Sequence, residues 1–481
     1  MADLDEYAGE FGPGAALMGR RLTIAQQPTL AVRVANNGLT DTYQARRFVA
    51  KHGHEWRFDH TRKKWLRFHD PLWRPEEPGD LTRTLIACAQ EFQVEARRIR
   101  DNETREKALR WAKYLESDTG LRKVRTVAQD LEPCAVDATA WNRDPWLLGA
   151  PNGIIDLKHG RLLQAGNDAH VTRSVGVAFD PHAASPRWLR FLSEVFDNDT
   201  AVVDYIQRVL GYFLTGLTSA QLWWLLYGEG ANGKTTLLNI VAHVLGEYAT
   251  TVPFSMFQLQ QQRSTIPDDL ATLPGKRLIH ASETIEGKRL DEARMKALTG
   301  SDRIAARPLF GQWFEFEPSH KVVLSCNHKP VVKDDSQGFW RRVHLIPFTQ
   351  RFDGPRRDNH LDEQLKIEGS GILAWMVQGS LRWHREGLQA PKAIEIATLG
   401  YRRDSDHLPD FLLECCELRE DGECEAAALQ NRYREWSDER QLPKDQRHSP
   451  VTFGERMAGQ FSRVERSSGR VYIGLVLRSK P

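Results

Sequence analysis

The sequence predicts an α/β protein whose central sheet is parallel. Three apolar runs, residues 222–227, 278–282 and 321–326, have the composition and length of buried strands. The first run enters a glycine-rich turn, which is followed by an apolar helical stretch that ends before Gly246. Strands that alternate with helices in this way are typical of a parallel sheet covered by helices.

The glycine-rich turn matches the pattern G-x-x-x-x-G-K-[ST] in the context that this pattern requires, between a strand and a helix. Its glycines allow successive backbone amides to face a phosphate, and the helix N-terminus adds partial positive charge. We expect Lys234 to reach the β- and γ-phosphates of ATP and the Thr235 hydroxyl to bind Mg²⁺. The predicted nucleotide-binding residues are Gly228, Glu229, Gly230, Ala231, Asn232, Gly233, Lys234, Thr235 and Thr236.

Polar residues follow each later strand at the position where catalysis needs them. Glu283 ends the second apolar run, and we expect it to help bind Mg²⁺ or to polarise the attacking water. Asn327 follows the third run and can bond both the water and the γ-phosphate. Arg341 and Arg342 precede another apolar segment and suit an arginine finger that acts on a neighbouring subunit. Taken one at a time, Glu283 also fits a solvent-exposed carboxylate, Asn327 a turn former and the two arginines a solvated face. Their order along the chain after the glycine-rich loop favours the catalytic interpretation.

The series of motifs at residues 228–236, 278–311, 320–330 and 340–348 resembles the superfamily 3 helicases. It is most similar to the phage and plasmid primase-helicase branch, which includes the poxvirus helicase-primase. Residues 152–160 and 180–181 resemble the domain that precedes the motor in that branch, so the resemblance covers residues 141–348. It implies an AAA+-like motor that forms a hexameric ring on single-stranded or forked DNA, translocates 3′ to 5′, and serves the replication of a mobile genetic element.

The chain departs from the family pattern at the second motif. Several members carry two adjacent acids there, whereas Ser282 and Thr284 flank Glu283 in this chain and Glu286 is the next acid. Glu283 is therefore expected to serve alone, with Glu286 as a weaker candidate. Members also align their finger with either Arg341 or Arg342, and both assignments stay open.

DNA contact is expected between the second and third motifs. Residues 303–316 predict two short strands around a turn with glycine, and in the family such a hairpin lies in the channel of the ring. Arg303 and Arg307 offer phosphate contacts and Phe310 an apolar surface, with Lys296 on the preceding helix as a further candidate. The alternative is that Phe310 and Trp313 are core aromatics.

Length and composition predict a multidomain cytoplasmic enzyme. The chain has 481 residues, a formal charge of +2 and six cysteines without zinc-site spacing. It has neither a run of eighteen apolar residues nor a signal-peptide core at its start, so no membrane association is expected. The near-neutral charge means that any DNA site must be a local patch.

The expected organisation has five parts. They are a mixed α+β N-terminal region at 1–130, a family-specific domain at 131–200, the ATPase domain at 201–360, a helical linker at 361–393, and a winged-helix-like domain at 394–481. Residues up to 40 look weakly ordered. The strands near residues 56–59 and 64–68 predict a small sheet with a buried face, or a nucleic-acid contact. Arg463, Arg466 and Arg470 in the last domain suit contacts to duplex origin DNA, and a protein-docking module is the alternative.

The residues before the family-specific domain carry no zinc-ribbon cysteine set and no acidic cluster for nucleotidyl transfer. The sequence therefore predicts an ATP-dependent DNA helicase that works with a separate primase and with host replication proteins. Two alternatives stay open: an origin-binding initiator that uses ATP to switch assembly, and a nucleotide-dependent scaffold with little hydrolysis.

Overall fold

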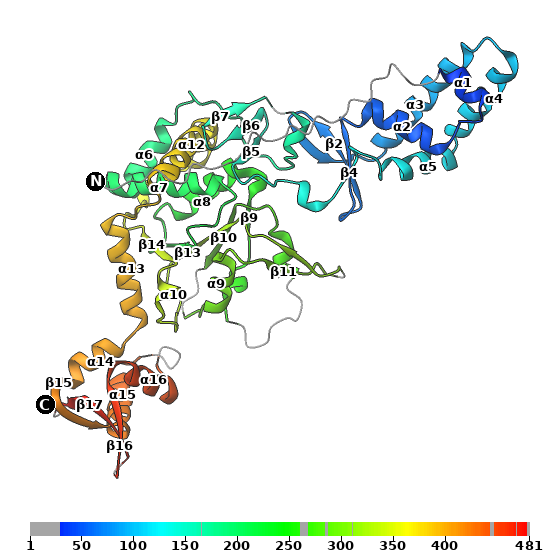
Figure 1. The fold of residues 1–481 in the computed structure, drawn as a ribbon. Coiled ribbons are helices and arrows are strands. Elements are labelled where there is room, and N and C mark those ends of the chain that lie inside the picture. The colour runs from blue at the N-terminus through cyan, green and yellow to red at the C-terminus, as the bar shows by residue number, and fades with distance from the viewer. Residues whose placement is uncertain are drawn as a thin grey trace, which may run out of the picture. The chain divides into compact units, whose positions relative to one another are not determined.

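The structure is a computed structural model, and it describes residues 29–164, 166–259, 268–283, 287–309, 311–442, 447–467 and 469–478. The chain divides into two compact units (Figure 1). The first contains residues up to Arg67 together with Pro75–Ala138, and the second contains Phe68–Arg74 and Thr139 onward.

The first unit packs helices against a small sheet. Its elements are α1 (Leu30–Ala35), α2 (Asp41–His52), β1 (Trp56–Asp59), β2 (Lys64–His69), α3 (Asp80–Arg97), α4 (Asn102–Leu115), α5 (Asp118–Ala128) and β4 (Ala135–Val136). β1 pairs antiparallel with β2 and parallel with β4. Trp56 and Trp65 are buried in the helical core, which favours the predicted sheet with a buried face over a nucleic-acid contact through these rings. Residues 30–35 form a helix, so the expectation of weak order is wrong there.

The second unit begins with strand β3 (Leu72–Pro75), most of which belongs to it, and continues into a larger α/β region. Its elements up to residue 405 are β5 (Leu147–Ala150), β6 (Gly153–Asp156), β7 (Arg161–Leu163), α6 (Pro186–Val195), α7 (Thr200–Leu214), β8 (Trp223–Tyr227), α8 (Lys234–Leu245), β9 (Ala249–Thr251), β10 (Leu278–Glu283), α9 (Glu292–Thr299), β11 (Ile304–Ala306), β12 (Phe314–Phe316), β13 (Lys321–Cys326), α10 (Gln337–Trp340), β14 (Val343–Pro347), α11 (Leu361–Ile367), α12 (Gly369–Glu386) and α13 (Lys392–Ser405).

Five of these strands form the predicted parallel sheet, in the order β14-β8-β13-β10-β9. Every pairing between neighbours is parallel, and β8 lies between β13 and β14. The carboxyl ends of β8, β10 and β13 therefore meet at one edge of the sheet. In an open parallel sheet that edge is the ordinary position of a ligand site.

Both faces of the sheet are covered, which explains the unbroken apolar character of β8. Trp224 and Leu226 belong to a core with α7, α8 and α12, whereas Trp223 and Leu225 belong to a core with α9, α10 and α13. On the first face, Gly211 of α7 and Gly379 of α12 meet so closely that a Cβ on Gly379 would lie 2.0 Å from the Gln207 carbonyl oxygen. The two helix backbones are thus in direct contact.

Two buried cations lie at the opposite, amino edge of the sheet. Arg277 precedes β10, donates to the carbonyls of Leu214 and Leu147, and stacks 4.6 Å from the centre of the Tyr248 ring. Lys321 begins β13 and donates to the carbonyl of Thr215. Burial lowers the pKa of both groups. Leu214 and Thr215 end α7, so the cations face the negative end of a helix dipole, which offsets part of their desolvation cost.

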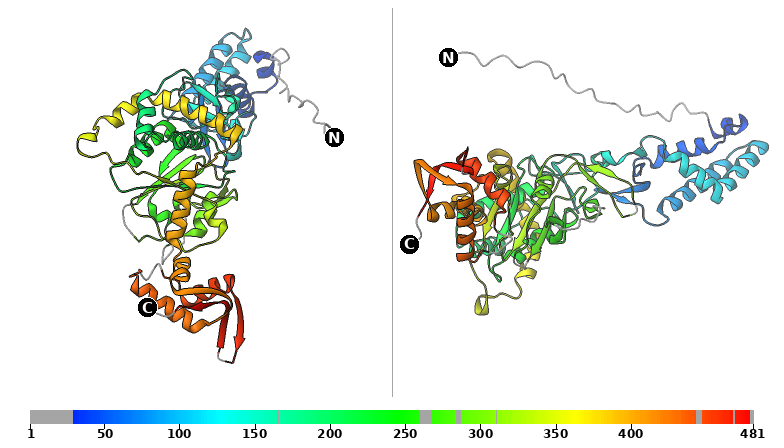
Figure 2. Two further views of the ribbon diagram at one scale, coloured as in Figure 1. Left: turned by 90° about the vertical axis from the view of Figure 1, so that its left-hand side faces the viewer. Right: turned by 90° about the horizontal axis from the view of Figure 1, so that it is seen from below.

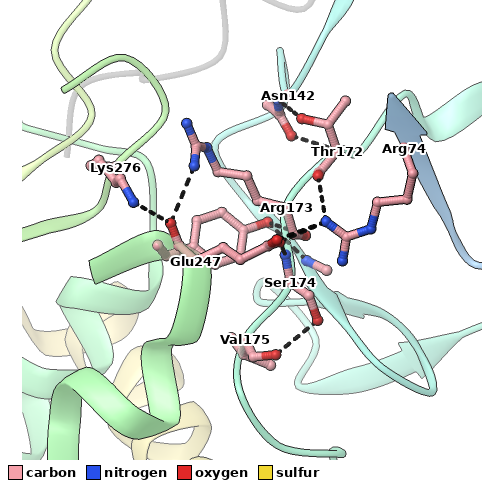
Figure 3. Close-up of polar contacts among 10 residues, drawn as sticks. Arg74, Asn142, Thr172, Arg173, Ser174, Val175, Glu247 and Lys276 are labelled. Carbon is pink, nitrogen blue, oxygen red and sulfur yellow. Dashed lines mark hydrogen bonds and ion pairs between the residues drawn. The ribbon is translucent and has the colours of Figure 1, made fainter. Parts of the chain in front are cut away.

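The short turn that follows α8 is held by Arg74, Arg173 and Ser174, which precede the glycine-rich loop, and by Lys276 (Figure 3). The Glu247 carboxylate accepts hydrogen bonds from Arg74 at 2.8 Å and from the Ser174 amide at 2.6 Å. Its backbone carbonyl accepts from Arg173 and Lys276. In the last turn of α8 itself, the Val244 carbonyl accepts a hydrogen bond of 2.9 Å from the Gly176 amide, which satisfies a group that the helix end leaves without a partner.

The chain after α13 forms a small antiparallel sheet with three helices. These elements are α14 (Leu408–Cys415), β15 (Cys416–Glu425), α15 (Ala426–Glu439), α16 (Pro450–Gln460), β16 (Ser462–Arg466) and β17 (Gly469–Leu477). β16 and β17 form the predicted terminal hairpin (Figure 2). Strand β15 was not predicted, because its sequence is mostly charged and exposed. It pairs with one side of β17, at the edge of the sheet, where charged side chains protect against association with other strands.

Helix α13 packs on the parallel sheet, where Thr398 accepts a hydrogen bond from the Leu345 amide and Tyr401 joins the core. Among the described helices, none combines the length and the apolar character needed to cross a membrane.

We predict that Arg277→Ala lowers the free energy of unfolding by about 3 kcal/mol, because the buried carbonyls of Leu214 and Leu147 lose their donor. Urea unfolding would measure the change. Arg385→Ala is the matched control, since that side chain is 69% exposed on α12, and its effect should stay within about 0.5 kcal/mol. Equal stability of the two variants would contradict the structural role of Arg277.

Candidate nucleotide and DNA site

The glycine-rich loop joins the end of β8 to the start of α8, as predicted. A Cβ on Gly228 would lie 2.2 Å from the Phe348 carbonyl oxygen, so only glycine fits there. Gly233 adopts φ +90°, which places the loop directly on the N-terminus of α8. Within the described ranges, the amides of Gly230, Ala231, Asn232 and Gly233 donate to no protein acceptor. A row of such amides at a helix N-terminus is an anion-binding arrangement.

Lys234 is buried under the loop. Its ammonium group donates to the Gly228 carbonyl, to Asn232 Oδ1 at 3.0 Å and to Asn327 Oδ1 at 3.2 Å. Burial lowers the pKa of Lys234 from its ordinary value. Thr235 is exposed on the first turn of α8, and Thr236 is half-buried beside it. The structure therefore brings Lys234 and Asn327 together from two adjacent strands, β8 and β13.

Glu283 ends β10, one strand beyond β13, and its side chain is half-buried. Gln258 Nε2 donates to Glu283 Oε2 at 3.2 Å. Thr284 and Glu286, which the sequence raised as neighbours of this acid, lie outside the described residues. The loop before Lys234, Asn327 and Glu283 thus lie at the carboxyl ends of β8, β13 and β10, which are consecutive strands in the sheet.

The two arginines lie at the other edge. Arg341 and Arg342 precede β14, whose first residue, Val343, pairs with Trp223 at the start of β8. A five-residue strand, roughly 16 Å long, separates them from the loop. Arg341 is exposed and donates to Gln221 Oε1 at 3.2 Å, whereas Arg342 is half-buried and donates to the Gln221 carbonyl at 3.4 Å. Burial lowers the pKa of Arg342.

The predicted hairpin exists as β11 and β12, which pair antiparallel. Arg303 is exposed and forms an ion pair with Glu317 at 3.3 Å, and Arg307 donates to the Gly311 carbonyl at 2.9 Å. Trp313 is 57% exposed, so its interpretation as a core aromatic is wrong. Phe310 lies outside the described residues.

Lys296 is separate from these arginines. It lies on α9, where its ammonium group pairs with Asp334 and donates to Ser336 Oγ at 3.2 Å. Its charge is therefore used within the chain, in the loop that follows Asn327.

Sequence reasoning missed two side chains, Gln258 beside Glu283 and Gln221 beside the arginines. Each lies outside the recognised motifs, in a segment without periodicity. Gln258 contacts a residue 25 positions away in the sequence, and Gln221 contacts one 120 positions away. No local pattern could have identified them.

Two family models match the chain. One is described as D5 N terminal like and covers residues 45–197, and the other is a family of unknown function, DUF5906, which covers residues 226–342. The first model spans parts of both compact units, and the second contains every predicted catalytic and nucleotide-binding residue.

Viral proteins are similar over about half of the chain. "Putative helicase L207/L206" of Acanthamoeba polyphaga mimivirus is 28% identical over 56% of this chain and 30% of its own length. "Putative helicase 022R" of Frog virus 3 is 23% identical over 52% of this chain and 27% of its own length. The apo structure of the NrS-1 C-terminal region aligns with 90% of this chain and 98% of that one, with 11% identity and a TM-score of 0.47.

The chain therefore matches less than a third of the length of these viral relatives. The two family models together cover the region before the glycine-rich loop and the residues Lys234, Glu283 and Asn327. Over the residues that these matches cover, the chain belongs to the D5-like primase-helicase family.

Proposed function

We propose that this protein is an ATP-dependent DNA helicase that works in the replication of a mobile genetic element. The observation that carries the proposal is the convergence of Lys234, Asn327 and Glu283 at the edge of the sheet that holds the glycine-rich loop. The names of the viral relatives support the same class of activity. The loop is proposed as a P-loop, and residues 201–360 as its AAA+-like ATPase domain.

The proposed chemistry is hydrolysis of the β–γ bond of ATP. Loop amides and Lys234 bind the phosphates, after Lys234 exchanges its carbonyl and amide partners for phosphate oxygens. Water attacks the γ-phosphorus while the bond to the β–γ bridging oxygen breaks, so that ADP leaves with that oxygen. Glu283 accepts the proton of the water, and Asn327 donates its amide to the γ-phosphate.

Thr235 and Glu283 fit Mg²⁺, because a hydroxyl and a carboxylate are the hard oxygen ligands that this ion prefers. The Thr235 hydroxyl is exposed at the loop, and Glu283 ends a strand at the same edge. When bound, the ion would neutralise charge on the β- and γ-phosphates.

An arginine finger supplied in trans is proposed, since neither arginine can span a strand's length to the loop of its own chain. Arg341 is the better candidate, because it is exposed while Arg342 is half-buried. A ring, with six subunits by analogy with the family, would supply this contact at every interface. Movement 3′ to 5′ along single-stranded DNA and cooperation with a separate primase belong to the same proposal.

DNA contact is proposed at the β11–β12 hairpin. Trp313 and Leu309 are each 57% exposed in its turn. Arg307 lies in the same turn, and Arg303 lies at the base of the hairpin, where it pairs with Glu317. An exposed aromatic ring beside arginines suits stacking on single-stranded bases and contact with phosphates.

The region after α13 is proposed as a winged-helix-like domain. Its Arg463 and Arg470 are exposed and suit duplex DNA, which would add origin recognition as a second function.

The decisive experiment measures ATP hydrolysis and forked-duplex unwinding by two inactive variants, separately and mixed. Lys234→Ala lacks the phosphate ligand, and Arg341→Ala/Arg342→Ala lacks the finger; each alone should lose activity. Randomly mixed rings should regain activity at about a quarter of their sites, where an intact loop meets an intact finger. A mixture that stays inactive although mixed rings form would contradict the finger in trans.

The wild-type protein separates the alternative functions. ATP hydrolysis without unwinding would favour an initiator, and nucleotide binding without hydrolysis would favour a scaffold.

We expect Gly233→Ala to weaken ATP binding at least tenfold, which corresponds to about 1.4 kcal/mol or more of strain in the loop. Its added Cβ would lie 2.8 Å from Val195 Cγ2, in a left-handed conformation. Gly230→Ala is the matched control, because a Cβ there would meet nothing within 4 Å. Titration with a fluorescent ATP analogue would measure both variants, and equal affinities would contradict the proposed loop.

Trp313→Ala should weaken binding of single-stranded DNA about tenfold through the loss of one stacked base. Arg303→Ala should instead lower the slope of log K against log salt by about 0.7. Fluorescence anisotropy with a labelled oligothymidine would separate the two effects. Ile367→Ala, which removes a side chain 85% exposed at the end of α11, should change neither quantity. Unchanged binding by Trp313→Ala would exclude the hairpin tip as a stacking surface.

A further inference from the structure

Helix α13 covers one edge of the parallel sheet (Figure 1). β14 is the last strand on that side, and the amide of Leu345 in β14 donates to Thr398 Oγ1 of α13 at 3.0 Å. Ile394 belongs to the hydrophobic core on one face of the sheet, and Tyr401 belongs to the core on the other face. The helix therefore crosses the edge of the sheet, and its outer side faces away from it.

The outer side of α13 carries a row of exposed side chains. Ile396 is 67% exposed and Leu399 is 60% exposed, and Lys392 and Arg403 are exposed on either side of them. These four residues, the α13 stripe, recur at intervals of three and four and so share one helix face. Within the described part of the chain, neither Lys392 nor Arg403 forms an ion pair. The stripe thus offers a pair of aliphatic side chains between two cations.

The α13 stripe is fixed relative to the proposed arginine finger. Arg341 follows Trp340, whose ring lies 5.1 Å from the ring of Tyr401 on α13. Trp340 and Tyr401 are both buried in the same hydrophobic core. Arg402, beside Tyr401, also donates to the Asp335 carbonyl at 3.0 Å, in the loop that leads to α10. A surface that contacts the stripe is therefore held at a defined position relative to Arg341.

The nucleotide loop has an exposed corner on α6. Val195 of α6 supports the loop, since a Cβ on Gly233 would lie 2.8 Å from Val195 Cγ2. Three exposed residues of α6 and the turn after it surround this contact, and we call them the loop corner: Leu189, Glu194 and Asp197. Because the corner supports the loop directly, a partner that binds the corner is placed next to the bound nucleotide.

The loop corner and the α13 stripe are opposite in charge. Asp197 forms no ion pair with any residue that the structure describes, and the Glu194 side chain stays 40% exposed although it pairs with Arg187 at 3.3 Å. Glu229 of the loop adds another exposed carboxylate, against one exposed cation on α6, Arg190. Complementary charge of this kind sets the register of a contact and speeds its formation.

We propose that the α13 stripe of one copy of the chain docks on the loop corner of the next copy, and that this contact brings Arg341 to the nucleotide of that next copy. The inference rests on the proposed helicase function and names the partner surface of the same site. Since two different surfaces meet, the interface is head-to-tail and repeats from copy to copy, and it closes into a ring when the rotation allows. The site around Lys234 is complete only when this contact forms.

Ile396→Asp/Leu399→Asp should raise the dissociation constant of the assembly at least about tenfold, because two carboxylates then enter an apolar contact beside acids of the partner. Analytical ultracentrifugation of the full chain with Mg²⁺ and a non-hydrolysable ATP analogue would measure assembly. ATP hydrolysis per chain should fall with it and recover at higher protein concentration. Val451→Asp is the matched control, since that side chain is 69% exposed on α16, outside both surfaces, and it should assemble like wild type.

A charge exchange tests whether these two surfaces meet. Lys392→Glu/Arg403→Glu makes the stripe acidic, and Glu194→Lys/Asp197→Lys makes the corner basic, so each variant alone should fail to assemble. In an equal mixture of the two variants, every acidic stripe finds a basic corner and every basic stripe an acidic corner, so alternating copies should assemble and hydrolyse ATP. Arg385→Glu, which reverses a charge on an exposed side chain of α12, should assemble alone like wild type.

The outcomes separate this inference from the proposed function. Wild-type assembly and hydrolysis by the aspartate variant would overturn the interface alone, and so would a charge-exchanged mixture that stays apart while the wild type assembles and hydrolyses ATP. A wild type that stays monomeric with the ATP analogue would overturn the interface and the finger in trans together. A wild type that assembles through these surfaces but hydrolyses no ATP would reject the helicase proposal and leave the interface in place.

Discussion

The pairing of β8 between β13 and β14 is the constraint on which the rest of the structure depends. Because β8 is buried on both faces, its register against β13 and β14 leaves little freedom at the end where the glycine-rich loop begins. Parallel pairing places Asn327 beside Lys234 and puts Glu283 one strand further along. The candidate site is thus a consequence of strand order. A small shift in the packing of these strands would displace all three side chains together.

Helix α8 transmits this constraint to the region before the ATPase motifs. Its N-terminus carries the loop, and Glu247, two residues after its C-terminal end, is bonded to Arg74, Arg173 and Ser174. Residues of β5 and β6 share one hydrophobic core with α7, α8 and β8. The family-specific region is therefore part of the body that supports the nucleotide loop.

The two edges of the sheet have different electrostatic roles. The carboxyl edge offers loop amides, one buried lysine and a carboxylate, an arrangement suited to a metal-bound polyphosphate. The amino edge holds cations whose partners are mainly carbonyls, including Arg277, Lys321 and the arginine pair before β14. A nucleotide bound at one edge cannot meet the arginines at the other within one chain. In the proposed mechanism, catalysis that used these arginines would require a second copy of the chain, and hydrolysis would then depend on assembly.

Most of the fold follows from local patterns. Many of the helices, the central buried strands and the terminal hairpin have periodicities that single segments reveal. Helix α1 and strand β15 do not: α1 was expected to be weakly ordered, and β15 is a charged edge strand that its pairing stabilises more than its side chains do. The glycine-rich motif likewise identified Lys234 and its neighbours, because turn chemistry and helix capping are properties of a few consecutive residues.

The sequence by itself determined the class of fold, the glycine-rich loop and the order of the polar residues at strand ends. Only the tertiary structure decided which of these residues meet, that Lys296 is engaged by Asp334, that Trp313 is exposed, and that Gln258 contacts Glu283. The reason is physical: periodicity and turn chemistry act over a few residues, whereas these contacts join segments that only strand order and packing bring together.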